Sequence, residues 1–368
     1  MNLEEKNSMN FLSRDSDFIV GKVGKLRRYL ICSMQGYFPV MVKTGANSLA
    51  AVFRTGAPHM GHQGTLAVSL SENGGVSWSD PKEIAPRWQD ARNPALGVNG
   101  KGHLIAAYWK AKASYKQEEL KEGRCIWNEA NEVNIDNFYI ISRDGGNTWS
   151  GEKPLALNVP GIYFFCPYGR IISDKSGVMY MSVYAARKTT KNDDSVFIIR
   201  SYDGGETWGD ESAFPEGFNE TSFVFLKSGV MVAAARSSSE GSVHIARSKD
   251  KGKSWSAPQR VTRGGEQPGD LCELKSGKLL LTYGRRRMPR GCGGLISRDG
   301  GETWDYEHEI LLAGDGILNG DLGYPSTVQL DDGTINTALY YASGSECSVN
   351  WWGDVSCQLI KYTEKDIT

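Results

Sequence analysis

The chain has 368 residues, with 42 Lys and Arg residues against 43 Asp and Glu residues, so its formal charge is −1. This balance argues against a strongly basic nucleic-acid binder and against an acidic disordered chain. The 43 glycines and many aromatic residues are typical of short strands joined by tight turns. No apolar run reaches the length of about 18 residues that a membrane span needs, so we expect no contact with a membrane.

The N-terminal segment from Met1 to Arg14 is polar and lacks the apolar core of a signal peptide. We therefore expect a cytoplasmic protein, or a secreted or periplasmic one whose signal peptide has been removed. The seven cysteines are widely spaced and form no C-x-x-C pair, so we interpret them as free thiols. His59 and His62 are only two possible metal ligands, and we expect neither a metal nor a cofactor.

An octet with the pattern S-x-[DN]-x-G-x-[TS]-W occurs five times. Its Asp or Asn can accept backbone N–H groups, its Gly allows a positive φ, and its Trp can cover the end of a hairpin. Five copies therefore indicate a repeated structural turn between two strands. The copies are Ser71–Trp78, Ser142–Trp149, Ser201–Trp208, Ser248–Trp255 and Ser297–Trp304.

A second repeat consists of short apolar segments, each preceded at a fixed distance by another apolar run and a tight turn. The segments are Leu49–Arg54, Leu104–Trp109, Met179–Tyr184, Met231–Arg236, Leu279–Gly284 and Ile335–Tyr340. Six units of about four strands predict an all-β fold, a six-bladed β-propeller. The sixth unit lacks an octet, and we expect Gln358–Tyr362 and the N-terminal Tyr29–Ser33 to complete it. We expect one domain over residues 1–368, with residues 1–28 partly extended and residues 111–137 forming a loop insertion.

The repeat register predicts which side chains share one end of the ring. The innermost strands of a propeller begin near the axis at the same end, and their antiparallel neighbours finish there. The predicted mouth thus combines a phenol and a carboxylate with guanidinium groups and aromatic rings, which suits a small anionic sugar. Its residues are Phe38, Asn93, Tyr168, Glu220, Pro268 and Tyr324, together with Arg54, Trp109, Tyr184, Arg236, Arg285 and Tyr340.

The octets resemble the Asp-box repeats of the sialidase (neuraminidase) superfamily, and the resemblance covers nearly the whole chain. Asn219-Glu220-Thr221, followed by Ala235-Arg236-Ser237, is similar to the sialidase segment with a catalytic Glu and an Arg of the carboxylate-binding triad. Gly323-Tyr324-Pro325-Ser326 resembles the segment with the nucleophilic Tyr. Asp90-Ala91-Arg92-Asn93-Pro94 resembles a further segment of the second blade.

The resemblance implies an exo-acting, retaining glycoside hydrolase that releases a terminal acidic sugar from a glycan. Tyr324 would attack the anomeric carbon, Glu220 would take its proton, and arginines would hold the substrate carboxylate. A tyrosine has a pKa of about 10 and needs such a base. Beside the register residues, the resemblance adds Arg92 as a substrate contact, and the third triad arginine is Arg285, Arg286, Arg287 or Arg290.

The sequence also departs from the sialidase pattern. Phe38 stands where the family has its first triad arginine. The loop Thr55–Gly64, where the family has its acid/base Asp, contains no carboxylate, so His62 or Asp90 would donate the proton. A uronate or another ulosonic acid is therefore an alternative to sialic acid. Two other functions remain open, namely a non-catalytic carbohydrate-binding propeller and a polysaccharide lyase that acts on uronates. The oligomeric state is open as well.

Overall fold

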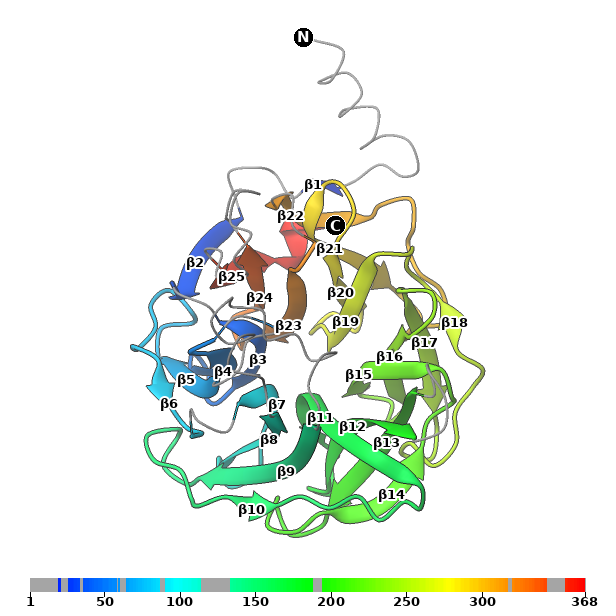
Figure 1. Ribbon diagram of the computed structural model, residues 1–368. Helices are drawn as coiled ribbons and strands as arrows, with labels where there is room; N and C mark the ends of the chain where they lie inside the picture. The colour runs from blue at the N-terminus through cyan, green and yellow to red at the C-terminus, as the bar shows by residue number, and fades with distance from the viewer. Residues whose placement is uncertain are drawn as a thin grey trace, which may run out of the picture.

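The computed structural model describes residues 19–20, 26–33, 36–57, 59, 64–86, 90–113, 133–187, 194–316, 320–342 and 355–367. In these residues the chain is all-β, apart from a 3₁₀ turn at Glu364–Asp366. The sheets are arranged as a ring around a central axis (Figure 1). The predicted all-β, propeller-like architecture is therefore confirmed.

The strands form five hydrogen-bonded sheets, each with long inner strands and shorter outer ones. The first sheet contains β3 (Tyr37–Lys43), β4 (Leu49–Thr55), β5 (Thr65–Ser71) and β6 (Lys82–Glu83). The second contains β7 (Ala91–Val98), β8 (Leu104–Ala113), β9 (Val133–Ser142), β10 (Lys153–Pro154), β11 (Ile162–Ser173), β12 (Met179–Arg187), β13 (Asp194–Ser201) and β14 (Gly209–Ala213). The third contains β15 (Phe218–Phe225), β16 (Met231–Ser237), β17 (Val243–Ser248) and β18 (Gln259–Arg260). The fourth contains β1 (Ile19–Val20), β19 (Glu266–Glu273), β20 (Leu279–Arg285), β21 (Arg290–Ser297) and β22 (Ile310–Gly316). The fifth contains β2 (Arg27–Cys32), β23 (Gly323–Gln329), β24 (Thr334–Ala342) and β25 (Val355–Thr363).

The expectation of six separate blades is met only in part, because one sheet has eight strands. Its two halves, β7–β10 and β11–β14, are each antiparallel. They are joined where β11 pairs with β7 in parallel, from Gly169 with Ala95 to Ile171 with Gly97. The loop insertion expected at residues 111–137 is also too long. Both of its ends belong to the β8–β9 hairpin, whose strands pair as far as Ala113 with Val133.

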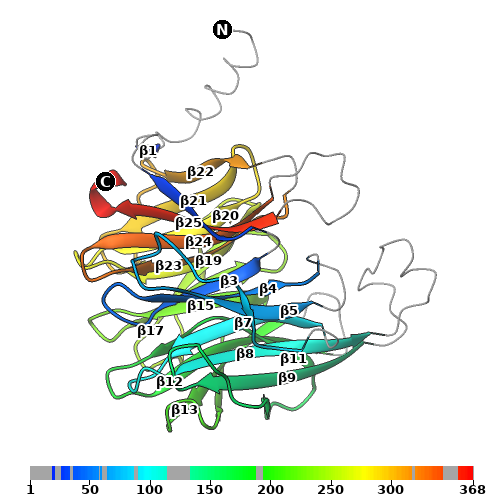
Figure 2. The same cartoon turned by 90° about the vertical axis from the view of Figure 1, so that its left-hand side faces the viewer.

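The N-terminal strand closes the ring against the C-terminal strand. β2 pairs with β25 from Arg27 opposite Lys361 to Cys32 opposite Cys357, as the sequence predicted. In the side view of Figure 2, β25 and β24 lie next to β3, on the side opposite β7. One apolar cluster, which includes Met41, Phe53 and Leu359, packs the last sheet against the first. The two chain ends are thus held together by both backbone pairing and side-chain burial.

The innermost strands share an irregularity that aims side chains at the axis. In β3, β7, β11, β15, β19 and β23 the register with the next strand shifts shortly after the strand begins. Phe38, Asn93 and Tyr324 lie in these bulges with φ values of 54°, 35° and 52°. Each of the three precedes a proline, which has no N–H for the ladder. The bulge therefore turns the side chain of the residue before each proline out of the sheet and into the mouth.

The five octets form equivalent turns at the opposite end of the ring, where the third strand of each antiparallel run finishes. In one of them the N–H of Thr148 donates to Asp144 Oδ1 at 2.8 Å, and the Gly146 N–H donates to Ser142 Oγ at 2.8 Å. The same bonds recur around Asn73, Asp203, Asp250 and Asp299. The expected structural role of the octets is therefore confirmed.

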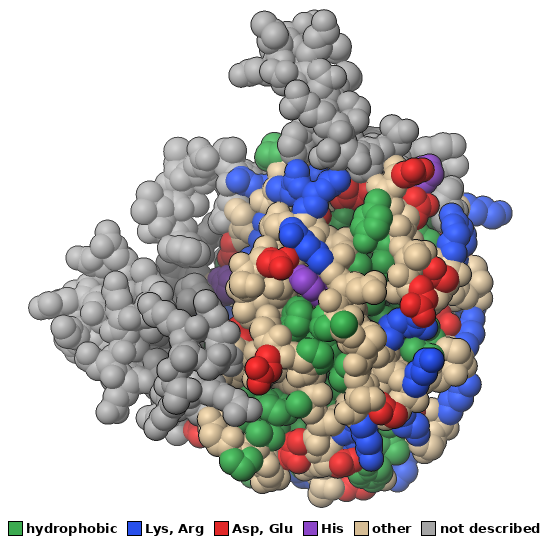
Figure 3. Space-filling model, turned by 90° about the vertical axis from the view of Figure 1, so that its right-hand side faces the viewer, with side chains coloured by type: hydrophobic (Ala, Val, Ile, Leu, Met, Phe, Trp, Pro, Cys, Tyr) green, Lys and Arg blue, Asp and Glu red, His purple; other side chains and the backbone are tan. Residues whose placement is uncertain are grey.

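Positive and negative side chains are interspersed on the face shown in Figure 3, and its hydrophobic side chains lie in small separate groups. Among the residues described, no helix has the length and apolarity that crossing a membrane requires. The large apolar side chains that are exposed, such as Tyr202, Met288 and Tyr306, come from different parts of the chain.

Candidate active site

Tyr324 and Glu220 meet at the mouth of the ring, as the repeat register predicted. Tyr324 lies at the start of β23 and Glu220 at the start of β15, and both are buried. The Tyr324 hydroxyl donates to Glu220 Oε1 at 2.6 Å. Asn219 fixes the backbone of Glu220, because its Oδ1 accepts the Glu220 N–H at 2.8 Å while its Nδ2 donates to Asp194. The two groups are thus held in contact before any ligand binds.

The surroundings of Tyr324 keep its hydroxyl protonated. Burial is the main cause that raises the pKa of Tyr324, and the charge of Glu220 raises it further. The nearby guanidinium groups of Arg236 and Arg286 act in the opposite direction but do not outweigh burial. Tyr324 can therefore act as a nucleophile only if Glu220 takes its proton as the new bond forms.

Arg236 and Arg286 are the predicted arginines that lie beside this pair. Arg236 Nη1 donates to Glu220 Oε2 and also lies 3.3 Å from the Tyr324 hydroxyl. The Arg286 guanidinium carbon lies 5.7 Å from the centre of the Tyr324 ring. Among the residues described, Arg286 Nε and Nη2 are buried and have no hydrogen-bond partner. A buried guanidinium with unsatisfied donors is suited to an anionic ligand.

Arg54 and Asp90 lie in a buried ion cluster instead of facing the mouth. Asp90 accepts from Arg54 Nη1 at 2.8 Å and from Arg92 Nε at 2.7 Å, and the Gly64 N–H also donates to it. Burial alone would raise the pKa of Asp90, but the two arginines outweigh it and the pKa is lowered. The lowered pKa means that Asp90 is ionised in this cluster. The expected roles of Arg54 as a substrate contact and of Asp90 as a proton donor stay predictions.

Arg92 and Trp109 are also engaged with protein groups. Arg92 Nη1 donates to the carbonyl oxygen of His59 at 2.8 Å. Its guanidinium lies 5.6 Å from the Trp109 ring centre, and both side chains are buried. Their expected contact with substrate stays a prediction.

Arg285 forms buried ion pairs with two carboxylates. It is 1% exposed, and its Nη1 donates to Glu266 at 3.0 Å and to Glu309 at 2.6 Å. It was predicted as a substrate contact; it is buried between two carboxylates, and the substrate role stays a prediction. Arg290 Nε lies 3.4 Å from the carbonyl oxygen of Arg286, so it contacts the backbone of the loop that carries Arg286. Its proposed contact with substrate stays a prediction.

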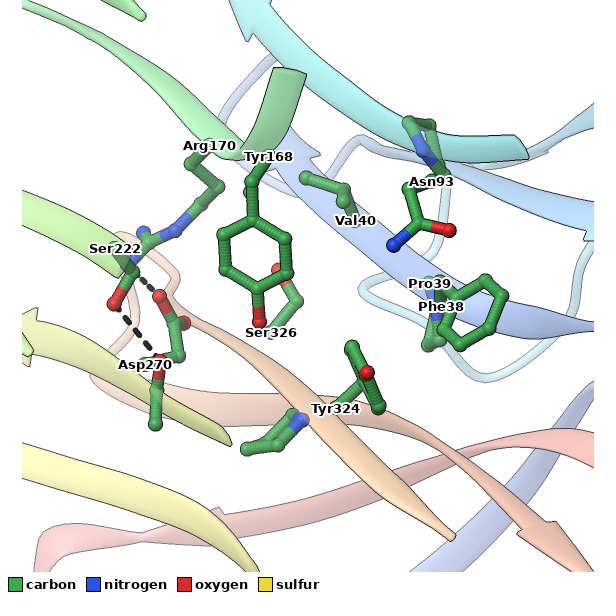
Figure 4. A pocket seen from close by; sticks show the side chains of 14 residues that line it. Phe38, Pro39, Val40, Asn93, Tyr168, Arg170, Ser222, Asp270, Tyr324 and Ser326 are labelled. Carbon is green, nitrogen blue, oxygen red and sulfur yellow. Dashed lines mark hydrogen bonds and ion pairs between the residues drawn. The ribbon is translucent and has the colours of Figure 1, made fainter. Parts of the chain in front are cut away.

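Aromatic rings surround Tyr324 on several sides. Phe38 and Tyr168 pack edge-on, with ring centres 4.8 Å and 6.3 Å from that of Tyr324, and the Tyr340 ring lies tilted at 5.6 Å. The predicted Tyr184 contacts Tyr168 and lies 3.5 Å from Asn93 Nδ2. Figure 4 shows Phe38, Asn93, Tyr168 and Tyr324 around one cavity, which also reaches the ion pair of Arg170 and Asp270 deeper along the axis. These rings give the mouth apolar walls.

One cluster at the mouth was missed by the sequence reasoning. His59 Nδ1 lies 2.8 Å from both carboxylate oxygens of Asp321, and the Tyr340 hydroxyl donates to Asp321 at 2.5 Å. Asp321 precedes β23 outside the repeated register, so no spacing signalled it. His62 lies outside the described residues. Within the described part of the chain, no group of three metal-ligating side chains occurs.

Residues 47–337 match the family described as BNR repeat-like domain. A sialidase from Bacteroides fragilis (strain YCH46) is 28% identical over 216 residues, which are 55% of this chain and 38% of that sialidase. The chain therefore matches well under half the length of this relative.

Three solved structures share the fold at low sequence identity. A protein of unknown function from Dyadobacter fermentans DSM 18053 has a TM-score of 0.75 at 23% identity, covering 92% of this chain and 99% of that chain. The Hadza microbial sialidase Hz136 has a TM-score of 0.70 at 19% identity, covering 93% and 69%. The NanB sialidase from Streptococcus pneumoniae has a TM-score of 0.65 at 13% identity, covering 92% and 70%. Because the family match spans most of its length, the chain belongs to the BNR repeat-like domain family, in the superfamily of the sialidases.

Proposed function

We propose that the protein is an exo-acting glycoside hydrolase that releases a terminal acidic sugar, sialic acid or a related one, with retention of configuration. The observation that carries this proposal is the 2.6 Å hydrogen bond from the Tyr324 hydroxyl to Glu220, with Arg236 in contact with both groups. A phenol paired with a carboxylate in a buried, arginine-lined mouth is suited to attack on an anionic sugar. The sialidases among the similar proteins support the same reaction class.

In the proposed reaction, Tyr324 Oη forms a bond to the anomeric carbon while its proton moves to Glu220. The bond from the anomeric carbon to the leaving oxygen breaks, and that oxygen takes a proton from an acid. Water then replaces Tyr324 at the anomeric carbon and gives a proton to the conjugate base of that acid, while the phenol recovers its proton from Glu220. A neutral phenol meets less repulsion from an anionic sugar than a carboxylate nucleophile would meet.

The substrate carboxylate would be held by Arg236 and Arg286. Arg286 offers donors that lack a partner among the described residues, and Arg236 lies against the Tyr324 hydroxyl. Phe38 contacts Tyr324 from the position where the sialidase pattern has an arginine. We therefore propose that two guanidinium groups bind the substrate carboxylate and that Phe38 makes the third position of the site apolar.

We also propose that the ring counts six blades. The eight-stranded sheet divides into two antiparallel runs of four strands, and one apolar cluster, which includes Ile105, Met181 and Phe197, lies between them. Such clusters recur around the ring between successive four-stranded groups. The parallel contact of β7 with β11 is then a contact between neighbouring blades near the axis.

A substrate panel tests the function. The full chain is incubated with 4-methylumbelliferyl ketosides of sialic acid and other ulosonic acids, and with aryl glycosides of uronic acids. Release of the aryl group together with a saturated free sugar supports hydrolysis. An unsaturated sugar product would instead indicate a lyase. Saturable binding of the free sugars without turnover would indicate a binding propeller, and either result would overturn the proposal.

A further inference from the structure

We propose that His59 is the acid/base residue of this site and that Asp321 positions it, an inference that rests on the hydrolase function proposed above. His59 lies in the loop between β4 and β5, at the same end of the ring as Tyr324. Its ring packs edge-on against Phe38 at 4.7 Å, and Phe38 in turn packs against Tyr324 at 4.8 Å. The His59 side chain is 24% exposed, so it is open to a ligand while it is fixed on one side.

A hydrolase of this design needs a proton donor besides Glu220. Glu220 is engaged by Tyr324 and Arg236 and faces the nucleophile. Asp90 is held by two arginines and stays ionised. The loop Thr55–Gly64 contains no carboxylate. Among the described groups at the mouth, His59 combines a partly exposed side chain with an imidazole ring, a group that can both give and take a proton.

The contact with Asp321 sets the chemistry of the imidazole. With the Asp321 carboxylate 2.8 Å from Nδ1, the ring donates its Nδ1–H to Asp321, so Nε2 carries the exchangeable proton. Burial raises the pKa of Asp321, but the hydrogen bond and charge of His59, the Tyr340 hydroxyl and the charge of Arg286 outweigh it, and the pKa is lowered. An ionised Asp321 can therefore accept the Nδ1–H and fix the orientation of the His59 ring.

The other neighbours orient the ring without competing for Nε2. The carbonyl oxygen of His59 accepts from Arg92 at 2.8 Å, and the phenol of Tyr37 hydrogen-bonds to the His59 backbone. Tyr37 also packs against the His59 ring at 5.8 Å. Within the described part of the chain, the groups that contact His59 include the Asp321 carboxylate, the Arg92 guanidinium on its backbone and the rings of Phe38 and Tyr37.

In the proposed step, His59 Nε2–H gives its proton to the leaving oxygen as the bond from that oxygen to the anomeric carbon breaks. In the second step, neutral His59 takes a proton from the attacking water, and the bond from Tyr324 to the sugar breaks. His59 thus ends the cycle as the imidazolium form with which it began.

Leaving-group dependence tests the role of His59. 3′-Sialyllactose has a poor leaving group that needs a proton, whereas 4-nitrophenyl sialoside has a leaving group that departs without one. We expect His59→Ala to lower kcat/KM for 3′-sialyllactose by about 100-fold or more, but to lower it less than about 10-fold for the nitrophenyl substrate. His308→Ala is the matched control, because His308 is exposed and pairs with Asp305 outside the mouth; it should change neither rate.

The pH profile gives a second readout. His59→Asp should keep part of the activity, and the alkaline limb of its kcat/KM profile should lie at lower pH because a carboxylic acid loses its proton earlier than an imidazolium. Asp321→Asn should lower kcat/KM for 3′-sialyllactose more than for the nitrophenyl substrate, because the imidazole loses the carboxylate that fixes its orientation.

The outcomes separate the two proposals. Equal losses for both substrates in His59→Ala, or an unmoved alkaline limb in His59→Asp, would overturn the role of His59 and leave the hydrolase function intact. A wild-type protein that hydrolyses neither substrate nor any other acidic glycoside would overturn both.

Discussion

At the scale of single residues, the site depends on which charged group each arginine meets. The sequence predicted that Tyr324 and Glu220 lie close together because both occupy the same position in their repeat units, at the start of an innermost strand. Arg54 and Arg236 also occupy equivalent positions of the repeat, and Arg285 lies one residue past the corresponding Gly284. Of these three, Arg236 contacts the pair, whereas Arg54 contacts Asp90 and Arg285 contacts Glu309. The arginines differ in the carboxylates that they contact, such as Asp90 and Glu309, and these partners lie at positions that the repeat register does not compare.

Replacing Tyr324 by Phe tests the proposed nucleophile. The variant keeps the ring contacts with Phe38 and Tyr340, so the free energy of unfolding should change by only about 1 kcal/mol. Turnover of the aryl ketoside should fall by about 1,000-fold or more, because no atom remains to form the covalent bond. Steady-state kinetics and thermal unfolding check both statements. Undiminished turnover by this variant would rule out Tyr324 as the nucleophile.

The neighbouring residues Arg285 and Arg286 should behave in opposite ways. Arg286→Ala should raise KM for the acidic substrate by about 10-fold or more, because one charged contact is lost, while the melting temperature stays close to that of the wild type. Arg285→Ala should destabilise the fold by about 3–5 kcal/mol, because Glu266 and Glu309 stay buried and lose the arginine that lies between them and nearest to each. Denaturant unfolding and kinetics on both variants measure the contrast, which an equal effect of the two changes would contradict.

At the scale of elements, the recurring bulges and octets explain why the sequence predicted the fold well. The octet fixes a turn through local bonds, and the bulge follows from an X-Pro pair or a short irregular step. Both features depend on residues that are close together in the chain, so the spacing of residue types in the sequence can predict them. The cluster of His59 and Asp321 could not be predicted in this way, because it joins the β4–β5 loop to the segment before β23, 262 residues apart.

The glycine at the fifth position of each octet packs against the neighbouring group of strands, which suggests a packing test. A Cβ on Gly205 would lie 2.6 Å from Ile105 Cγ1, whereas a Cβ on Gly145 would meet nothing within 4 Å. Both glycines have positive φ, so Ala costs about 1 kcal/mol at either position. Gly205→Ala should cost a further 1–3 kcal/mol, roughly, from overpacking. Chemical denaturation of the pair gives the difference, and equal stabilities would refute this packing role.

The octet carboxylates should contribute to acid sensitivity. Hydrogen bonds from the Thr148 side chain and backbone lower the pKa of Asp144 to about 2. A carboxyl group with a lowered pKa stabilises the fold above its unfolded value of about 3.9, and this contribution disappears as the pH falls toward 2. Asp144→Asn, which mimics the natural Asn73 octet, should therefore lose less stability on acidification. The free energies of unfolding of the wild type and of Asp144→Asn, measured between about pH 6 and pH 2, should converge as the pH falls. A difference that stays constant over this range would contradict the account.

At the scale of the whole molecule, ring closure depends on β2. This strand covers the edge of β25, and Arg28 adds two hydrogen bonds across to Asp315 on β22. A variant that lacks residues 1–33 exposes the edge of β25, so it should melt at least about 5 °C lower and self-associate. A variant that lacks only residues 1–18 is the control. Calorimetry and size-exclusion chromatography compare them; matching behaviour of the two truncations would argue against closure by β2.

The central claim is that Tyr324, activated by Glu220, forms a covalent bond to the sugar at the mouth of the ring. Its most direct test is to incubate the protein with 2,3-difluorosialic acid, which slows the second step, and then to locate the adduct by peptide mass spectrometry. The account predicts one sugar attached to Tyr324, and no attachment in Tyr324→Phe. A sugar attached to another residue, or an unmodified protein that still hydrolyses sialosides, would contradict it.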